Sequence, residues 1–164
     1  MRCRSTIRAS FLLAFAACLF FFAAPRGHAQ FFGGVSATTI PQAGLIQPAD
    51  LNNLIKGPAA ARPLMLQVGS RMMFAQAHIP GSFYIGPGSQ PSGLQALESK
   101  VESSPKSRFI VLYCGCCPWT HCPNVGPAYK KLHDLGYTNV KVLYIASNFG
   151  DDWVSKGYPV QSGQ

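Results

Sequence analysis

Residues 108–124 read RFIVLYCGCCPWTHCPN, an apolar run that leads directly into a group of four cysteines. The apolar and aromatic residues from Phe109 to Tyr113 predict a buried β-strand. Beyond the cysteines, Asn124 can cap a helix that extends to about residue 135, and Gly136 can end it. The cysteines are therefore expected in a loop between the end of a strand and the start of a helix.

The chain on either side of this stretch alternates between strand-like and helix-like patterns. Apolar runs predict strands at residues 63–68, 83–85 and 140–144, and helical spacing predicts helices at residues 48–56 and 94–101. Strands separated by helices imply right-handed crossovers, so we expect an α/β domain in which helices flank a mostly parallel sheet. Ligands collect beyond the carboxyl ends of the strands in such sheets, where Cys114 would lie.

The N-terminal residues have the pattern of an export signal. Three arginines within residues 2–8 precede an apolar run at residues 9–24, which is shorter than the roughly 20 residues of a membrane span. Residues 27–29 (GHA) form a small-x-small pattern that suits cleavage before Gln30. We therefore predict a signal peptide at residues 1–29 and a periplasmic or secreted protein that has no membrane attachment after cleavage.

The rest of the chain is predicted to hold one arm and one domain. Residues 30–47 are rich in Gly, Ala, Thr and Pro and have no apolar period, so we expect an extended arm or linker there. The alternating patterns begin at Pro48, and the remaining length suits a single domain. We accordingly predict the folded domain at residues 48–164.

The charge of the chain does not favour a nucleic-acid partner. The 164 residues carry 14 Lys and Arg against 6 Asp and Glu, which gives a formal net charge of +8. Four of the arginines lie in the predicted signal peptide, which leaves +4 for the rest of the chain. Because no cluster of basic residues remains in that part, we expect no nucleic-acid binding.

Five short motifs follow one another along the predicted domain. They are the strand at residues 64–68, AHIPGS at 77–82, the strand that ends in Tyr113-Cys114, LHDLGY at 132–137, and a tail with Trp153 and GYPV at 157–160. AHIPGS is similar to the GHIPGA of rhodanese-like domains, and the ordered set, from about Pro48 to Val160, resembles that family. The resemblance implies a rhodanese-like α/β fold and sulfurtransferase activity, with Cys114 as the nucleophile that accepts sulfane sulfur. His78 is predicted to be structural, with its ring hydrogen-bonded to nearby backbone.

The position of Cys114 supports this role on chemical grounds. A cysteine between a strand end and a helix N-terminus is close to backbone N–H groups and to the positive end of the helix dipole, so we expect its pKa to lie below the usual value of about 8.5. The thiolate would take sulfur from a small donor, hold it as a persulfide and pass it to a thiol acceptor. We assign no cofactor, and the sequence names no partner protein.

The other residues of the loop are candidates for substrate contact or for assistance to the nucleophile. They are Gly115, Cys116, Cys117, Trp119, His121 and Cys122. His121 can support a thiolate, donate a proton or bind a metal, and Trp119 is expected to cover the loop by packing. The segment from Cys114 to Gly136 is about five residues longer than the common pattern of the family. Residues 114–124 contain no Lys or Arg, which argues against an anionic donor such as thiosulfate.

Three functions remain compatible with the four cysteines. The first, which we favour, is sulfur transfer through Cys114, with a neighbouring cysteine that resolves the persulfide or protects the site. The second is thiol–disulfide exchange, because Cys114 and Cys117 form a C-x-x-C motif. The third is a Cu(I) or Zn module, whose soft ligands would be Cys116, Cys117, His121 and Cys122, although we assign no resident metal. Any stable disulfide is expected between Cys122 and either Cys116 or Cys117.

Overall fold

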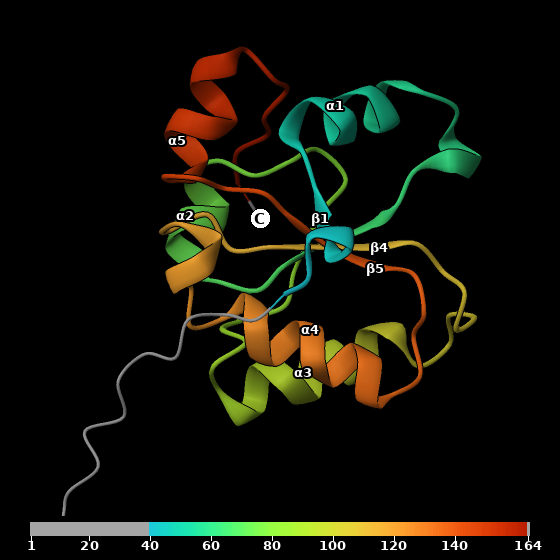
Figure 1. Cartoon of the computed structure of the whole chain (residues 1–164). Helices are drawn as coiled ribbons and strands as arrows, with labels where there is room; N and C mark the ends of the chain where they lie inside the picture. The colour runs from blue at the N-terminus through green and yellow to red at the C-terminus, as the bar shows by residue number, and fades with distance from the viewer. Residues whose placement is uncertain (1–39, 164) are drawn as a thin grey trace, which may run out of the picture. The chain divides into compact units, whose positions relative to one another are not determined.

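Five parallel strands form the centre of the computed structural model, which describes residues 40–163 (Figure 1). The strands are β1 (Leu45–Ile46), β2 (Leu64–Gln67), β3 (Phe83–Tyr84), β4 (Ile110–Tyr113) and β5 (Val140–Leu143). Their order across the sheet is β1-β5-β4-β2-β3, so β4 lies in the middle between β2 and β5. This arrangement confirms the predicted parallel α/β sheet, and it places Cys114 at the carboxyl end of the central strand.

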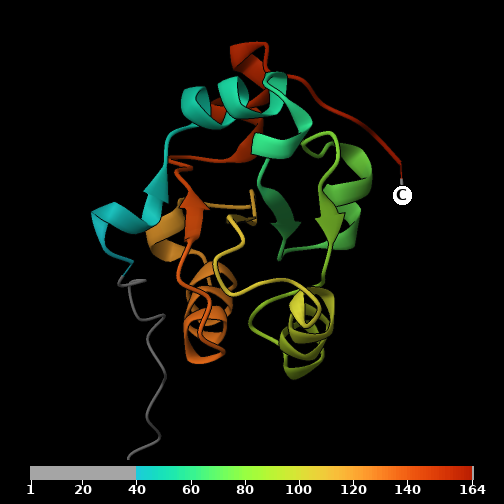
Figure 2. The same cartoon turned by 90° about the vertical axis from the view of Figure 1, so that its right-hand side faces the viewer.

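Helices cover both faces of the sheet (Figures 1 and 2). Helices α1 (Pro48–Lys56) and α5 (Phe149–Asp152) pack on one face, and α3 (Pro91–Val101) and α4 (Val125–Asp134) pack on the other. A further helix, α2 (Arg71–Gln76), follows β2. Short 3-10 turns occur at Gln42–Gly44, Ala59–Ala61, Trp119–His121 and Val154–Lys156. None of the helices in the described residues is both long and apolar enough to cross a membrane.

The alternation of side chains along β4 divides the core into two layers. Ile110 and Leu112 pack with the residues of α3 and α4, whereas Val111 and Tyr113 pack with those of α1 and α5. Successive side chains of a strand point to opposite faces of the sheet, so Cys114, the next residue, belongs to the layer of α3 and α4. This alternation decides the side of the sheet on which the Cys114 sulfur lies.

The folded domain begins earlier than predicted. Leu45 and Ile46 pair with Val142 and Leu143 of β5, and Ile40 is buried in the core, so the C-terminal part of the predicted arm belongs to the domain. The two residues of β1 lie within a stretch that has no apolar period, so the sequence did not distinguish them from the predicted arm. The predicted signal peptide, its cleavage site and residues 30–39 lie outside the described residues.

His78 has the structural role that the sequence predicts. Its ring is buried, its Nδ1 lies 2.8 Å from the carbonyl oxygen of Phe74, and it stacks on the Phe74 ring. Its backbone exchanges two hydrogen bonds with Gln161, each 2.9 Å long. The motif at residues 77–82 therefore anchors the C-terminal tail rather than contributing to a reactive site.

Candidate active site

The backbone at Cys114 is fixed by a side chain from the neighbouring strand. The Gln67 amide donates from Nε2 to the Cys114 carbonyl oxygen over 3.1 Å, and its Oε1 accepts from the Gly69 N–H over 3.1 Å. Gly69 leaves the space that the sulfur needs, because a Cβ at this position would lie 2.7 Å from Cys114 Sγ. The ends of β2 and β4 thus form a joint platform that holds the Cys114 sulfur.

Three of the four loop cysteines, including Cys114 itself, form a cluster. The sulfurs of Cys114, Cys116 and Cys122 all lie within 4.8 Å of one another, and Cys114 Sγ is 3.3 Å from Cys116 Sγ. Cys117 is at the margin, with its sulfur 3.2 Å from that of Cys116. Because Cys114 and Cys122 are buried and Cys116 is exposed, the cluster opens to solvent at Cys116.

Asn124 contacts the cluster instead of capping α4. It occupies the N-cap position, but its side chain makes no capping hydrogen bond. Its Oδ1 accepts from the backbone N–H and the hydroxyl of Ser89, over 3.1 and 2.8 Å, and its Nδ2 donates to Cys114 Sγ over 3.3 Å. Since both bonds from Ser89 occupy the oxygen, the amide nitrogen is turned toward the sulfur. The predicted cap is therefore wrong, and Asn124 becomes part of the site.

The cluster stabilises a thiolate on Cys116 rather than on Cys114. Hydrogen bonds from the Cys114 and Cys122 thiols hold the pKa of Cys116 well below its usual range. The pKa of Cys114 is raised, chiefly by its hydrogen bond with Cys116, and the pKa of Cys122 is raised by its bonds to both. Burial raises the pKa of Cys117 to about 11. The lowered pKa predicted for Cys114 is thus wrong, because its buried thiol serves as a donor to the more exposed Cys116.

The remaining predicted site residues shape the loop or lie outside the cluster. Gly115 has a φ of +92°, and a Cβ at this position would lie 2.9 Å from the Cβ of Phe149, the first residue of α5. Trp119 packs at the edge of the core and donates its backbone N–H to the Ile145 carbonyl over 2.9 Å. His121 is exposed and its Nδ1 lies 2.9 Å from the Thr120 hydroxyl, away from the sulfurs.

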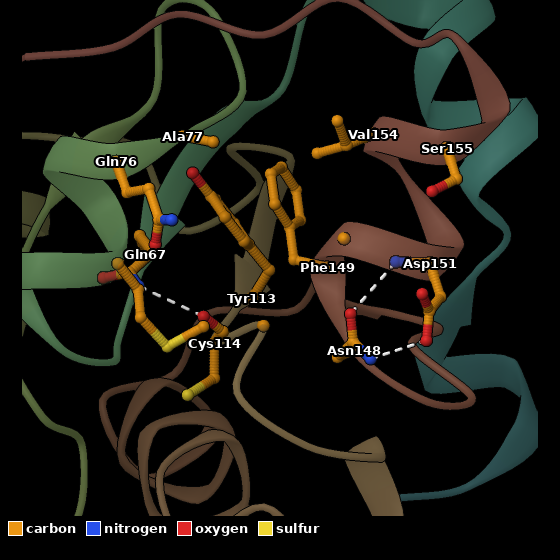
Figure 3. A pocket seen from close by; sticks show the side chains of 13 residues that line it. Gln67, Gln76, Ala77, Tyr113, Cys114, Asn148, Phe149, Asp151, Val154 and Ser155 are labelled. Atoms are coloured by element: carbon orange, nitrogen blue, oxygen red, sulfur yellow. Dashed lines mark hydrogen bonds between the residues drawn. The ribbon is translucent and has the colours of Figure 1, made fainter.

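A cavity of about 480 Å³ lies on the other side of the Cys114 backbone. Tyr113 and Phe149 form much of its wall, and Asp151 alone carries a charge among the described residues that line it. In Figure 3 the side chain of Cys114 points away from the centre of this cavity, as the alternation along β4 requires. The cavity therefore adjoins the backbone of Cys114, whereas its sulfur belongs to the cysteine cluster. The cavity could not be predicted from the sequence, because its wall includes residues of α5, a helix too short to show a period.

A comparison with models of protein families shows the family to which this domain belongs. The family model described as the rhodanese-like domain matches residues 47–144, more than half of the chain. The chain belongs to the rhodanese-like domain family. A search of curated proteins finds no match.

Several solved structures share the fold at low sequence identity. A rhodanese-like domain from Anabaena sp. is 20% identical, with a TM-score of 0.52, over 73% of this chain and 79% of that chain. A Bacillus halodurans protein is 24% identical, with a TM-score of 0.54, over 71% of this chain and 75% of that one. A thiosulfate sulfurtransferase from Pseudomonas aeruginosa is 22% identical, with a TM-score of 0.53, over 75% of this chain and 20% of the longer protein.

This rhodanese-like domain therefore combines a familiar fold with a distinctive loop. Cys114 leaves the central strand, where the family resemblance expects the nucleophile. Around it the chain supplies two further sulfurs and the amide of Asn124, in a loop without Lys or Arg. The chemistry available to the rhodanese-like site is thus the chemistry of thiols and of neutral hydrogen-bond donors.

Proposed function

We propose that this rhodanese-like domain is a sulfurtransferase that carries sulfane sulfur as a persulfide on Cys114. The observation that carries the proposal is the hydrogen bond of 3.3 Å from Asn124 Nδ2 to Cys114 Sγ, in which Ser89 fixes the orientation of the amide. Donors aimed at a sulfur stabilise the negative charge of a thiolate or of a persulfide anion. The backbone N–H of Cys116 also bonds to the Cys114 sulfur and favours its charged form.

The proposed reaction is a double displacement. The Cys114 thiolate attacks the outer sulfur of a donor R–S–SH. A new S–S bond forms at Cys114, and the donor leaves as R–S⁻. An acceptor thiolate then attacks the outer sulfur of the Cys114 persulfide and releases the Cys114 thiolate. The Cys114 proton has a nearby acceptor, because the Cys116 sulfur lies 3.3 Å away. No net oxidation occurs, because each step exchanges one S–S bond for another.

The charges around the site favour a donor of low charge, such as an organic persulfide, over thiosulfate. The loop at residues 114–124 contains no Lys or Arg, and the neighbouring cavity has Asp151 in its wall. A dianion at this place would lose hydration without gaining a cationic partner. The acceptor is proposed to be a thiol.

Soft-metal binding is a second candidate, favoured by one observation. Three cysteine sulfurs within 4.8 Å of one another offer a thiolate set of the kind that binds Cu(I) or Zn. The members of this set are Cys114, Cys116 and Cys122, whereas the sequence pointed to Cys117 and His121 in place of Cys114. The thiol–disulfide exchange function of the C-x-x-C motif is less well supported, because Cys117 lies outside the group of three sulfurs that contains Cys114.

Export to the periplasm or secretion completes the proposal. It rests on the signal-like pattern of residues 1–29. N-terminal sequencing of protein recovered from cell fractions tests it, with Gln30 as the expected first residue. Recovery of the uncleaved chain in the membrane fraction would contradict it.

Incubation with glutathione persulfide, followed by mass spectrometry, tests the proposed reaction. We expect a gain of about 32 Da on Cys114 and transfer of that sulfur to a thiol acceptor. Cys114→Ser should form no stable persulfide and lose turnover, and Cys117→Ser is the control for a cysteine at the margin of the cluster. If metal binding is the function instead, Cu(I) should remain bound through purification and the donor should leave no added sulfur.

A further inference from the structure

The sulfur of Cys114, which would carry the persulfide in the proposed function, is shielded from solvent. Cys114 is 4% exposed, and its sulfur is enclosed by Gly69, Asn124 and Cys122. The adjoining cavity does not reach it, because the side chain points to the opposite side of the backbone (Figure 3). A donor the size of a tripeptide persulfide therefore cannot contact this sulfur directly in the observed arrangement.

Cys116 is the cysteine of the cluster that such a donor can reach from solvent. It is exposed, and its sulfur is 3.3 Å from Cys114 Sγ, so a sulfur atom bound to Cys116 would lie beside Cys114. The intervening Gly115 has a φ of +92°, a conformation that favours glycine and turns the chain so that the two cysteine sulfurs meet. The loop thus places one exposed and one buried cysteine sulfur next to each other.

We propose that Cys116 is the exchange point of a two-cysteine sulfur relay, in which external donors and acceptors react with Cys116 and the sulfur is stored on Cys114. The proposal rests on the persulfide chemistry proposed above and assigns a second catalytic residue to it. Cys117 has no such role, because its sulfur lies next to that of Cys116 and its pKa is raised by burial.

The relay steps balance without an oxidant or a reductant. The Cys116 thiolate attacks the outer sulfur of R–S–SH, and R–S⁻ leaves with the electron pair of the broken S–S bond. Cys114 then attacks the outer sulfur of the Cys116 persulfide, the Cys116 S–S bond breaks, and the Cys114 proton passes to the departing Cys116 sulfur. The products are Cys114–S–SH and Cys116–SH. Delivery to a thiol acceptor is the reverse sequence with the acceptor in place of the donor.

The protonation of the cluster agrees with this order of events. The thiolate of the set resides on Cys116, so the first attack begins at the exposed sulfur. The Cys114 thiol remains protonated until a persulfide is next to it. Cys114→Ser keeps a hydrogen-bond donor beside Cys116 but removes the buried sulfur that stores the transferred atom, so a persulfide could form only on the exposed Cys116 and none should persist.

Loading kinetics of the full chain test the relay, with glutathione persulfide as the probe and Cys117→Ser as the matched control. We expect Cys116→Ser to slow both loading and unloading of Cys114 by about 100-fold, whereas Cys117→Ser stays within about threefold of the wild type. In rapid-quench samples of the wild type, fragment mass spectra should show added sulfur on Cys116 before Cys114. Circular dichroism checks that the variants are folded.

The order in which the two cysteines gain sulfur separates a relay from a neighbour that only accepts the Cys114 proton. If Cys116 is only a proton acceptor, the rapid-quench samples should show added sulfur on Cys114 and none on Cys116 at any time, which would overturn the relay and leave the proposed function intact. Faster or unchanged loading in Cys116→Ser would overturn the relay in the same way. A loss of about 2 Da with release of sulfide would show a Cys114–Cys116 disulfide and would also overturn it. If neither the wild type nor Cys116→Ser gains sulfur, the proposed function fails and the relay fails with it.

Discussion

Asn124 donates a hydrogen bond from Nδ2 to the Cys114 sulfur over 3.3 Å, although Asn124 occupies the N-cap position of α4. Ser89, which is 35 residues away in the chain, makes this contact possible by bonding to the amide oxygen. The Asn124 side chain therefore contacts the Cys114 sulfur and does not cap its own helix. Substitutions of Asn124 consequently test the site rather than the stability of α4.

Asn124→Asp should lower the rate of sulfur transfer by about 10- to 100-fold, because a hydrogen bond to a charged group contributes roughly 1.5–3 kcal/mol. The carboxylate can still accept from Ser89, but its second oxygen would repel a thiolate or persulfide at Cys114. Steady-state rates with glutathione persulfide measure the effect. Ser89→Ala, which removes one of the two orienting bonds, should cause a smaller loss, and an Asp variant with unchanged rates would refute the role of the amide.

Cys116 should be the cysteine that is alkylated first at mildly acidic pH. Its pKa is lowered, so its thiolate is already present at pH values where an ordinary thiol, with a pKa of about 8.5, is protonated. Cys117, with a pKa of about 11, should react only as the solution becomes alkaline. Iodoacetamide labelling across pH 5 to about 10, followed by peptide mass spectrometry, gives the profile. Preferential labelling of Cys114 at low pH would contradict the assignment of the thiolate.

Gly69→Ala should displace the Cys114 sulfur, because the new Cβ would lie 2.7 Å from it and 2.9 Å from Gln67 Nε2. We expect a loss of about 1–3 kcal/mol in the free energy of unfolding, as overpacking of a close contact causes. Slower persulfide loading should accompany it. Urea unfolding and loading rates measure the two effects. Gly57→Ala, remote from the site and 3.3 Å from the Leu54 carbonyl, is the control that should leave loading unchanged.

Cu(I) should inhibit sulfur transfer reversibly, because it binds the same thiolates that the reaction uses. Removal of metal with a Cu(I) chelator should restore full activity. Cys122→Ser should weaken the inhibition, whereas His121→Ala should not, since His121 lies outside the cluster. Activity that disappears on chelation would favour the metal function instead.

Patterns within single segments of the sequence predicted most of the fold. The apolar run at residues 109–113 and the helical spacing of α1 and α4 placed the main strands and helices to within a few residues. The two-residue strand β1 and the helices α2 and α5, of six and four residues, were missed, because none of them is long enough to show a period. The equally short β3 was predicted because Pro80-Gly81 and Gly86-Pro87 bound its apolar run. Short elements were therefore predicted only where turn residues mark both of their ends.

The site was predictable in position but not in chemistry. The strand that ends at residue 113 identified Cys114 as the residue at the carboxyl edge of the sheet. The partnership of Asn124 with Ser89, and the transfer of the thiolate to Cys116, depend on residues that meet only in three dimensions. A dipole argument based on Cys114 alone therefore predicted the wrong cysteine for the lowered pKa. The hydrogen bond between the Cys114 and Cys116 side chains has the stronger effect on the pKa values of both.

Site-localised mass spectrometry after treatment with glutathione persulfide tests the central claim most directly. We predict that the wild type gains about 32 Da, that fragment spectra place the stable persulfide on Cys114, and that a thiol acceptor removes it. In Cys114→Ser no stable persulfide should remain and turnover should be lost. Full transfer activity in Cys114→Ser, or a wild type that never holds sulfur on Cys114, would contradict the account.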